Sequence, residues 1–408
     1  MEFHPVIWIA LALWLAASAW YAYRLWRRKG LRWIPPYLFT RSRRRPVSPD
    51  EEIHVLLCVT DHYEPKFGAA STDEGRGRVE HWVTEYPRQF ARFRDSDGRT
   101  PRHSFFFPVE EYEPEYLDAL AGLCRAGFGE VEVHLHHNND SADNLRSTLA
   151  AFRDLLDRRH GLLCRDRSGA LRYGFIHGNW GLCNSRPRRD WCGVNNEIDI
   201  LLDTGCYADF TFPSAPDGTQ PALTNRIYYA VDRPGQPCSH WRGWDIGAPR
   251  VPDKALLLIQ GPLLLDWRRR KFGLLPRLEN ACLQTSQPPS LLRLDYWLRA
   301  RIHVPARPDW LFVKLHAHGA PESMHDVMLG PPMVRFHEEL AQRAAAQPRF
   351  HYHYVSAREM YNLAKAAEAG FRGTVAEALD FLLVSNISNR KTAASERAPE
   401  PATHAPGG

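Results

Sequence analysis

The stretch EVEVHLHHNND, residues 130–140, begins as an alternating strand and ends in a dense group of polar side chains. Because successive side chains of a strand point to opposite faces, His134 and His136 are expected to share one face. His137 points to the other face unless the strand has already ended. Three imidazoles followed by Asp140 indicate either a metal site or polar groups bonded to one another and to water.

Apolar runs that are typical of strands alternate with segments of helical spacing along most of the chain. Residues 114–128 and 141–161 have the helical spacing, and Ser141 is expected to cap the second of these helices. Such alternation is typical of an α/β fold in which helices cover a parallel sheet. We expect strands at residues 53–62, 103–112, 130–137, 171–180, 208–215, 254–261, 310–319 and 349–357.

Polar residues recur at the carboxyl ends of these expected strands, which is where a parallel α/β barrel forms its active site. Asp61 can bind a metal or accept a proton from an activated water, or it can simply belong to a turn. His316 and His318 share a strand face and can protonate a leaving group or stabilise an oxyanion, or they can form a satisfied polar pair. The residues concerned are Asp61, His62, His134 to Asp140, His177, Asn179, His316 and His318.

A second group of residues suggests carbohydrate as the substrate. In the segment around His177, the Asn179 amide can hold a sugar hydroxyl, and Trp180 can stack on a sugar ring. Asp209 can orient a neighbouring histidine or merely occupy a strand. The chain has no glycine-rich phosphate loop and no GxSxG motif, which disfavours a serine hydrolase. Its aromatic residues are not interleaved with basic ones, so nucleic acid is not an expected partner.

The order of these motifs resembles that of the polysaccharide deacetylase family, within the glycoside hydrolase/deacetylase barrel superfamily, from about residue 53 to residue 366. The family's first motif, Thr-Phe-Asp-Asp, corresponds to Val-Thr-Asp-His at residues 59–62, and its late Leu-x-His motif to the sequence beginning at Leu315. The family's second motif has two histidines four apart. Here the corresponding pair is His134 with His137, ranked first, or His136 with Asp140. The family's Arg-x-Pro-Tyr motif is absent, and residues 177–180 occupy a similar place.

The resemblance implies an incomplete (β/α) barrel, often seven-stranded, and a divalent metal ion, with zinc ranked above cobalt or nickel. It implies that Asp61 is the base, that His62 replaces a metal-binding aspartate, and that His316 or His318 is the acid. The expected activity is hydrolysis of a C–N bond other than a peptide bond, by removal of an acetyl group from an N-acetylated (or O-acetylated) sugar or polysaccharide. The alternatives are a metal-dependent glycosidase of the same superfamily and a non-catalytic scaffold in polysaccharide assembly.

The N-terminal region predicts a membrane anchor. Residues 6–23 carry no charge and are long enough to span a bilayer, and nine Lys and Arg residues follow between positions 24 and 45. The positive-inside rule then predicts a single-pass protein of the inner membrane with a cytoplasmic catalytic domain. Eight scattered cysteines fit a reducing compartment, although Cys183 and Cys192 could pair in a periplasmic domain.

The expected domains are therefore an anchor at residues 1–28, a basic and proline-rich linker at 29–51, a deacetylase-like barrel at 52–370 and a disordered tail at 386–408. The substrate of such an anchored enzyme could be lipid-linked. Its expected partners are the membrane, through the N-terminal helix, and proteins of exopolysaccharide biosynthesis.

Overall fold

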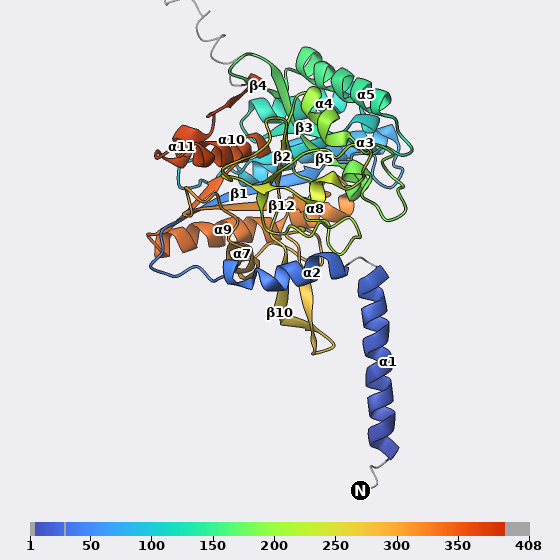
Figure 1. The fold of residues 1–408 in the computed structure, drawn as a ribbon. Coiled ribbons are helices and arrows are strands. Elements are labelled where there is room, and N and C mark those ends of the chain that lie inside the picture. The colour runs from blue at the N-terminus through green and yellow to red at the C-terminus, as the bar shows by residue number, and fades with distance from the viewer. Residues whose placement is uncertain (1–4, 28–29, 388–408) are drawn as a thin grey trace, which may run out of the picture.

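A twelve-stranded, mostly parallel sheet forms the centre of the structure (Figure 1). The structure is a computed structural model that describes residues 5–27 and 30–387. β1 pairs along one edge with β12, and along its other edge with β13 and then β2. From β2 the sheet continues through β3, β5, β6 and β9 to the antiparallel strands β7 and β8. The strands are β1 Ile53–His62, β2 His103–Pro108, β3 Gly129–Leu135, β4 Cys164–Asp166, β5 Leu171–His177, β6 Cys206–Asp209, β7 Ile227–Ala230, β8 Trp244–Asp245, β9 Leu256–Ile259, β10 Leu264–Lys271, β11 Leu275–Glu279, β12 Trp310–Ala317, β13 Phe350–Tyr354 and β14 Leu383–Ser385.

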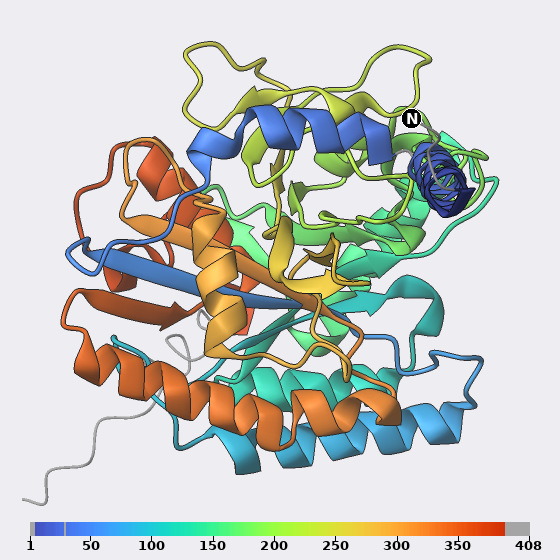
Figure 2. The same ribbon diagram turned by 90° about the horizontal axis from the view of Figure 1, so that it is seen from below.

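Helices pack on both faces of this sheet, and their termini follow local sequence signals. The side chain of Ser141 accepts a hydrogen bond from Asn144 N at 3.2 Å, which confirms the predicted cap of α5. Figure 2 shows α3 and α9 in one layer along a side of the sheet. The helices are α1 Pro5–Arg27, α2 Gly30–Phe39, α3 Thr72–Phe90, α4 Pro114–Arg125, α5 Ala142–Leu155, α6 Glu197–Asp203, α7 Leu291–Arg299, α8 Glu322–Met328, α9 Pro331–Ala346, α10 Ala357–Glu368 and α11 Val375–Ala378.

The side-chain alternation of β1 divides the interior into two apolar cores. Val55 and Leu57 belong to one core together with Trp82 of α3. Leu56 belongs to the other core together with Met360 of α10. All of these side chains are buried, and full burial of one such side chain contributes roughly 1.5–3 kcal/mol. Because the alternation continues to the end of β1, Asp61 and His62 point to opposite faces of the sheet.

The predicted α/β class is right, but the predicted seven-stranded (β/α) barrel is wrong. Among the described residues, the strand path runs from β12 to β8 and does not return to its start. The free edge of β12 is occupied by an irregular segment, since His316 N donates to Ala281 O at 3.1 Å and Leu283 N donates to His316 O at 2.8 Å. The far edge of β9 pairs antiparallel with β7. These contacts use the backbone groups that closure by strands would need.

The predicted membrane-spanning anchor is also wrong. α1 stands away from the rest of the structure (Figure 1). Within residues 5–27 and 30–387, no helix combines the length and the apolarity needed to cross a bilayer. Alanine, serine, tryptophan and tyrosine are interspersed along α1, and they contribute less apolarity than leucine, isoleucine or valine. The predicted single-pass localisation in the inner membrane rested on this segment and is corrected with it.

The segments on either side of the expected domain pack against it. In the expected linker, Trp33 and Tyr37 of α2 are buried against Ala215 and Leu263. Beyond residue 370 the chain continues into α11 and β14, and β14 pairs antiparallel with β4. The predicted tail begins at residue 386, and its residues 388–408 lie outside the described part of the chain.

Candidate metal centre

Five side chains converge at the carboxyl ends of β1, β3 and β12. We call them the strand-end cluster, and they are His62, Glu64, His134, His136 and His318. The ring centroid of His62 lies 4.8 Å from that of His134 and 4.6 Å from that of His318. The rings of His134 and His136 are 4.6 Å apart, so the predicted sharing of one face is confirmed. Glu64 belongs to two groups whose ligand atoms all lie within 4.8 Å of one another, one with His62 and His318 and one with His134 and His136.

The hydrogen bonds of the strand-end cluster direct lone pairs toward one carboxylate. His134 Nδ1 is 2.8 Å from the carbonyl oxygen of Ile176, which requires a proton on Nδ1 and leaves Nε2 as the free nitrogen. His136 Nδ1 donates a hydrogen bond to the Glu110 carboxylate, and this contact outweighs burial and raises the pKa of His136. The two Nε2 atoms then face Glu64 Oε1 at 3.3 and 3.7 Å. Acceptors that face one another inside a protein need a shared proton or a metal ion between them.

Burial and the neighbouring charged groups both shift the pKa values of the residues in this cluster. Burial lowers the pKa of His62 well below its usual range, and the neighbouring rings of His318 and His134 lower it further. Burial also lowers the pKa of His318. Burial opposes ionisation of Glu64, but its contact with His134 and the nearby imidazoles of His318 and His136 outweigh burial and lower the pKa of Glu64. Imidazole nitrogens beside a carboxylate are a donor set that divalent metal ions such as zinc bind, so this cluster can hold one.

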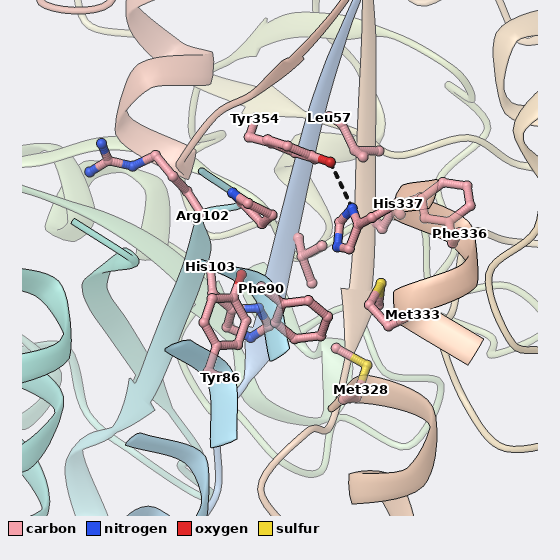
Figure 3. Close-up of a pocket in the computed structure, with 13 residues that line it drawn as sticks. Leu57, Tyr86, Phe90, Arg102, His103, Met328, Met333, Phe336, His337 and Tyr354 are labelled. Carbon is pink, nitrogen blue, oxygen red and sulfur yellow. Dashed lines mark hydrogen bonds between the residues drawn. The ribbon is translucent and has the colours of Figure 1, made fainter. Parts of the chain in front are cut away.

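The structure places Asp61 outside the strand-end cluster. Asp61 is fully buried, its Oδ2 lies 2.9 Å from His103 Nε2, and its Oδ1 accepts a hydrogen bond from Gly319 N at 2.6 Å. His103 lines a small, mainly apolar pocket on the face of the sheet covered by α3 and α9, close to Tyr86 (Figure 3). The residues of the strand-end cluster are not among those that line this pocket. Asp61 therefore joins β1 to the turn that follows β12, and both of its oxygens are engaged.

The motif HLHH is divided between two sites. His134 and His136 enter the strand-end cluster, whereas the His137 ring turns to the opposite face, where its Nε2 lies 2.9 Å from His177 Nε2. Asp140 accompanies His137, with Oδ2 3.0 Å from His137 Nδ1. The structure thus does not bring together either of the pairs expected from the family motif, His134 with His137 or His136 with Asp140. β3 ends at Leu135, so His136 and His137 lie directly after the strand.

His316 and Asp209 lie among buried polar groups. His316 Nδ1 is buried and has no hydrogen-bond partner among the described residues, and burial lowers the pKa of His316 well below its usual range. Burial raises the pKa of Asp209 to about 7, although its carboxylate accepts hydrogen bonds from Thr211. Lys314 donates to the carbonyl of Phe210, and burial lowers its pKa to about 7. These groups are buried and are therefore not parts of an exposed sugar site.

The residues expected to bind sugar do not gather beside the strand-end cluster. His177 is fully buried next to His137. Asn179 and Trp180 are half-buried and adopt φ angles of 53° and 54° in the loop after β5. Asp209 is buried at the end of β6. A short sequence motif does not specify where a loop of this kind turns, so proximity in sequence was a poor guide to their positions.

Three carboxylates in or near the strand-end cluster were not predicted from the sequence. Glu64 lies two residues beyond His62, a spacing that would have placed it on the same face had the strand been extended by two residues. Glu110 and Glu111 follow β2 directly in the turn Val109–Glu111. Burial raises the pKa of Glu111 to about 7, and the charges of Glu64 and Glu110 add to this effect. The backbone N–H of Lys66 donates to Glu111, which places this carboxyl over the segment that carries Glu64.

No protein-family model and no curated protein sequence matches the chain. The resemblance to polysaccharide deacetylases therefore rests on the motifs of the sequence.

Proposed function

We propose that the chain is a metal-dependent hydrolase that removes acetyl groups from an N-acetylated sugar or polysaccharide. The observation that carries this proposal is the strand-end cluster, in which four imidazoles surround one ionised carboxylate at the carboxyl ends of parallel strands. Such nitrogen and oxygen donors suit zinc first, with cobalt and nickel as alternatives. A bound divalent ion supplies a Lewis acid for the acetyl carbonyl and lowers the pKa of a water molecule.

The cluster is closed on one side and open on the other. His62, Glu64 and His134 are buried, whereas the side chain of His136 retains 27% of its exposure. Phe67 is 47% exposed, and its ring lies 6.1 Å from that of His318. We infer that substrate approaches from the side of His136 and His318, where the Phe67 ring offers a flat apolar surface to a sugar.

Proton transfer in this site is assigned to Glu111. A general base works best when its pKa lies near the working pH, and burial raises the pKa of Glu111 to about 7. Glu111 is half-buried at the open side, and its neighbour Glu110 contacts the His136 ring. In this role Glu111 accepts a proton from the attacking water and returns it to the leaving amine. Asp61, predicted as the base from the sequence, then acts by holding the turn at Gly319 beside His318.

The test is to purify the full chain and measure metal content and acetate release from chitooligosaccharides after loading with zinc, cobalt or nickel. We expect zinc to bind and acetate to be released. The matched control is His81→Ala, which alters an exposed histidine of α3. The proposal is wrong if the purified chain binds no metal, or if it releases no acetate with any of the three ions.

The same reaction mixtures separate the alternative functions. A glycosidase releases reducing sugar instead of acetate, so both products are assayed on one sample. A scaffold releases neither product, whichever ion is added. Release of acetate alone is the result that the deacetylase proposal requires.

A further inference from the structure

A second group of four metal-binding side chains lies on the other face of the sheet from the strand-end cluster. It consists of His137, His177, Cys192 and Glu197, whose ligand atoms all lie within 4.8 Å of one another. We call it the loop cluster, because it joins the ends of β3 and β5 to the loop of residues 178–196. His177, Cys192 and Glu197 are fully buried, and the His137 side chain is 6% exposed.

The two imidazoles of the loop cluster direct their Nε2 atoms at the same point. His137 Nδ1 lies 3.0 Å from the Asp140 carboxylate and therefore carries a proton. His177 Nδ1 contacts the carbonyl oxygen of Gly178, and the Gly181 N–H donates to the same nitrogen at 3.2 Å. The Nε2 atoms of the two rings face each other at 2.9 Å. Backbone carbonyls and carboxylates hold metal-binding histidines in this same way.

The Glu197 carboxylate lies against both of these imidazoles. Its Oε1 lies 3.4 Å from His137 Nε2 and 3.5 Å from His177 Nε2, and it accepts no hydrogen bond from the described residues. Its Oε2 accepts from Cys183 N at 2.6 Å, which fixes the carboxylate orientation. One added proton would join only two of these three facing atoms. Nitrogen and oxygen ligands at about 2.0–2.1 Å from a tetrahedral zinc ion lie about 3.3 Å apart. Glu197 Oε1 lies 3.4 and 3.5 Å from the two Nε2 atoms, close to this value, and the two Nε2 atoms are closer together, at 2.9 Å.

Cys192 places a sulfur atom beside the Glu197 carboxylate. Burial and this carboxylate raise the pKa of Cys192, and the thiol donates to Glu197 Oε2 at 3.4 Å, so a bound metal ion has to displace the thiol proton. The backbone N–H groups of Asn184 and Val194 donate to the sulfur at 3.3 and 3.4 Å. A thiolate is the metal-binding form of cysteine, and N–H donors stabilise that form. All eight cysteines are free, so the sulfur of Cys192 is not consumed in a disulfide with Cys183.

The loop that carries Cys192 has little regular structure of its own. It is tied to the HHNND motif, because Asp140 N donates to Cys192 O at 2.9 Å and Trp191 N donates to Asn138 Oδ1 at 2.7 Å. Gly193 has a φ of 106°, and an added Cβ there would lie 2.5 Å from Asp140 N. Six other loop residues adopt positive φ, which L-residues rarely do. They are Asn179, Trp180, Cys183, Asn184, Arg189 and Trp191.

We propose that the loop cluster is a structural zinc site that fastens residues 178–196 to the ends of β3 and β5. Two nitrogens, one sulfur and one oxygen complete a tetrahedral shell from protein side chains alone, which is the composition of a closed site. The sulfur ligand selects zinc over magnesium, calcium and manganese. This site goes beyond the proposed deacetylase activity and does not rest on it.

Cobalt distinguishes the two clusters, because a thiolate bound to Co²⁺ gives a near-ultraviolet charge-transfer band and the strand-end cluster contains no cysteine. We expect the cobalt-loaded full chain to show this band and Cys192→Ser to lose it together with one bound metal ion. The matched control Cys124→Ser, in α4, retains both. Cobalt-loaded wild-type protein without the band, a wild-type chain that binds no cobalt, or a band that persists in Cys192→Ser would overturn the proposal.

Protease sensitivity supplies a readout that does not depend on the folding of a variant. Arg188 and Arg189 are exposed in the loop. We expect a chelator to make the wild-type chain sensitive to trypsin at these two residues, and zinc to restore resistance. Cleavage at these sites that is equally fast with and without zinc would contradict the proposal. Because neither measurement uses acetate release, failure of the zinc site and failure of the deacetylase proposal remain distinguishable.

Discussion

The strand-end cluster and the loop cluster use similar groups in different surroundings. Both combine imidazoles with one glutamate, and both take ligands from HLHH, which spans the last two residues of β3 and the two residues after it. The strand-end cluster is carried on or directly after regular strands, and its His136 is partly exposed. The loop cluster adds a thiol, is almost fully buried, and takes two of its ligands from beyond β5. Catalytic metal sites keep an open position and structural sites do not, so exposure separates the two roles where ligand identity does not.

The strongest test of this contrast is His134→Ala. This change removes a nitrogen ligand from the strand-end cluster, and we expect acetate release to fall roughly 1,000-fold, the scale of several kcal/mol of transition-state stabilisation. The cobalt–thiolate band should stay unchanged, because the band belongs to Cys192. Initial rates and the absorption spectrum of the same cobalt-loaded sample check both statements. A simultaneous loss of the band would mean that the two clusters are not independent.

The opposite change, His177→Ala, should act on stability. It leaves the Glu197 carboxylate buried with one partner fewer, which typically costs about 3 kcal/mol. We expect the free energy of unfolding in urea to fall by that amount, and the thiolate band to disappear. His337→Ala is the control, since His337 is also buried but contacts Tyr354 rather than a metal-binding group. Zinc should increase the free energy of unfolding of His337→Ala more than that of His177→Ala. An equal increase in both variants would refute the structural role of the loop cluster.

The sequence predicted those parts of the fold and of the clusters that depend on local periodicity. The α/β class followed from the alternation of strands and helices, and the shared face of His134 and His136 followed from the two-residue period of β3. The sequence left the face of His137 open, and it did not predict the partners of His137, because these come from segments far along the chain. Cys192 and Glu197 reach the loop cluster through an irregular loop, for which periodicity makes no prediction.

The prediction of a closed barrel was wrong for a similar reason, because closure does not depend on local periodicity. Whether the edge of β12 meets another strand depends on which backbone groups reach that edge first. Here Ala281 and Leu283 take the hydrogen bonds of His316. Such competition between distant segments leaves no periodic signal in the sequence. The family resemblance supplied an expectation about closure that the residues themselves did not contain.

Glu111→Gln sharpens the catalytic side of the comparison through pH. Wild-type activity should rise as pH increases through about 7, because burial raises the pKa of Glu111 to about 7 and the base is its ionised form. The variant should lose this limb and roughly 100-fold of the rate at pH 8, the lower end of general-base contributions. Rates of acetate release across pH 5 to 9 measure both effects.

The same shift affects stability with the opposite sign. Between the usual glutamate pKa of 4.5 and about 7, the folded chain binds more protons at Glu111 than the unfolded chain does. Its contribution to stability is therefore present at low pH and is lost as pH rises through this window. Urea unfolding of wild type and Glu111→Gln at several pH values checks the sign. A difference between the two that grows in favour of wild type as pH rises would contradict the assignment.

The smallest effect is expected from Asp61→Asn, which decides between Asp61 and Glu111 as the base. Asparagine keeps an oxygen that can accept from Gly319 N but weakens the contact with His103, so the turn at Gly319, directly after His318, loosens without collapsing. Loss of such a supporting contact typically costs 10- to 100-fold, and we expect about tenfold, with the pH limb near 7 preserved. If Asp61 is instead the base, the variant loses that limb and Glu111→Gln keeps it. The two pH profiles, measured side by side, assign the proton transfer to one carboxylate.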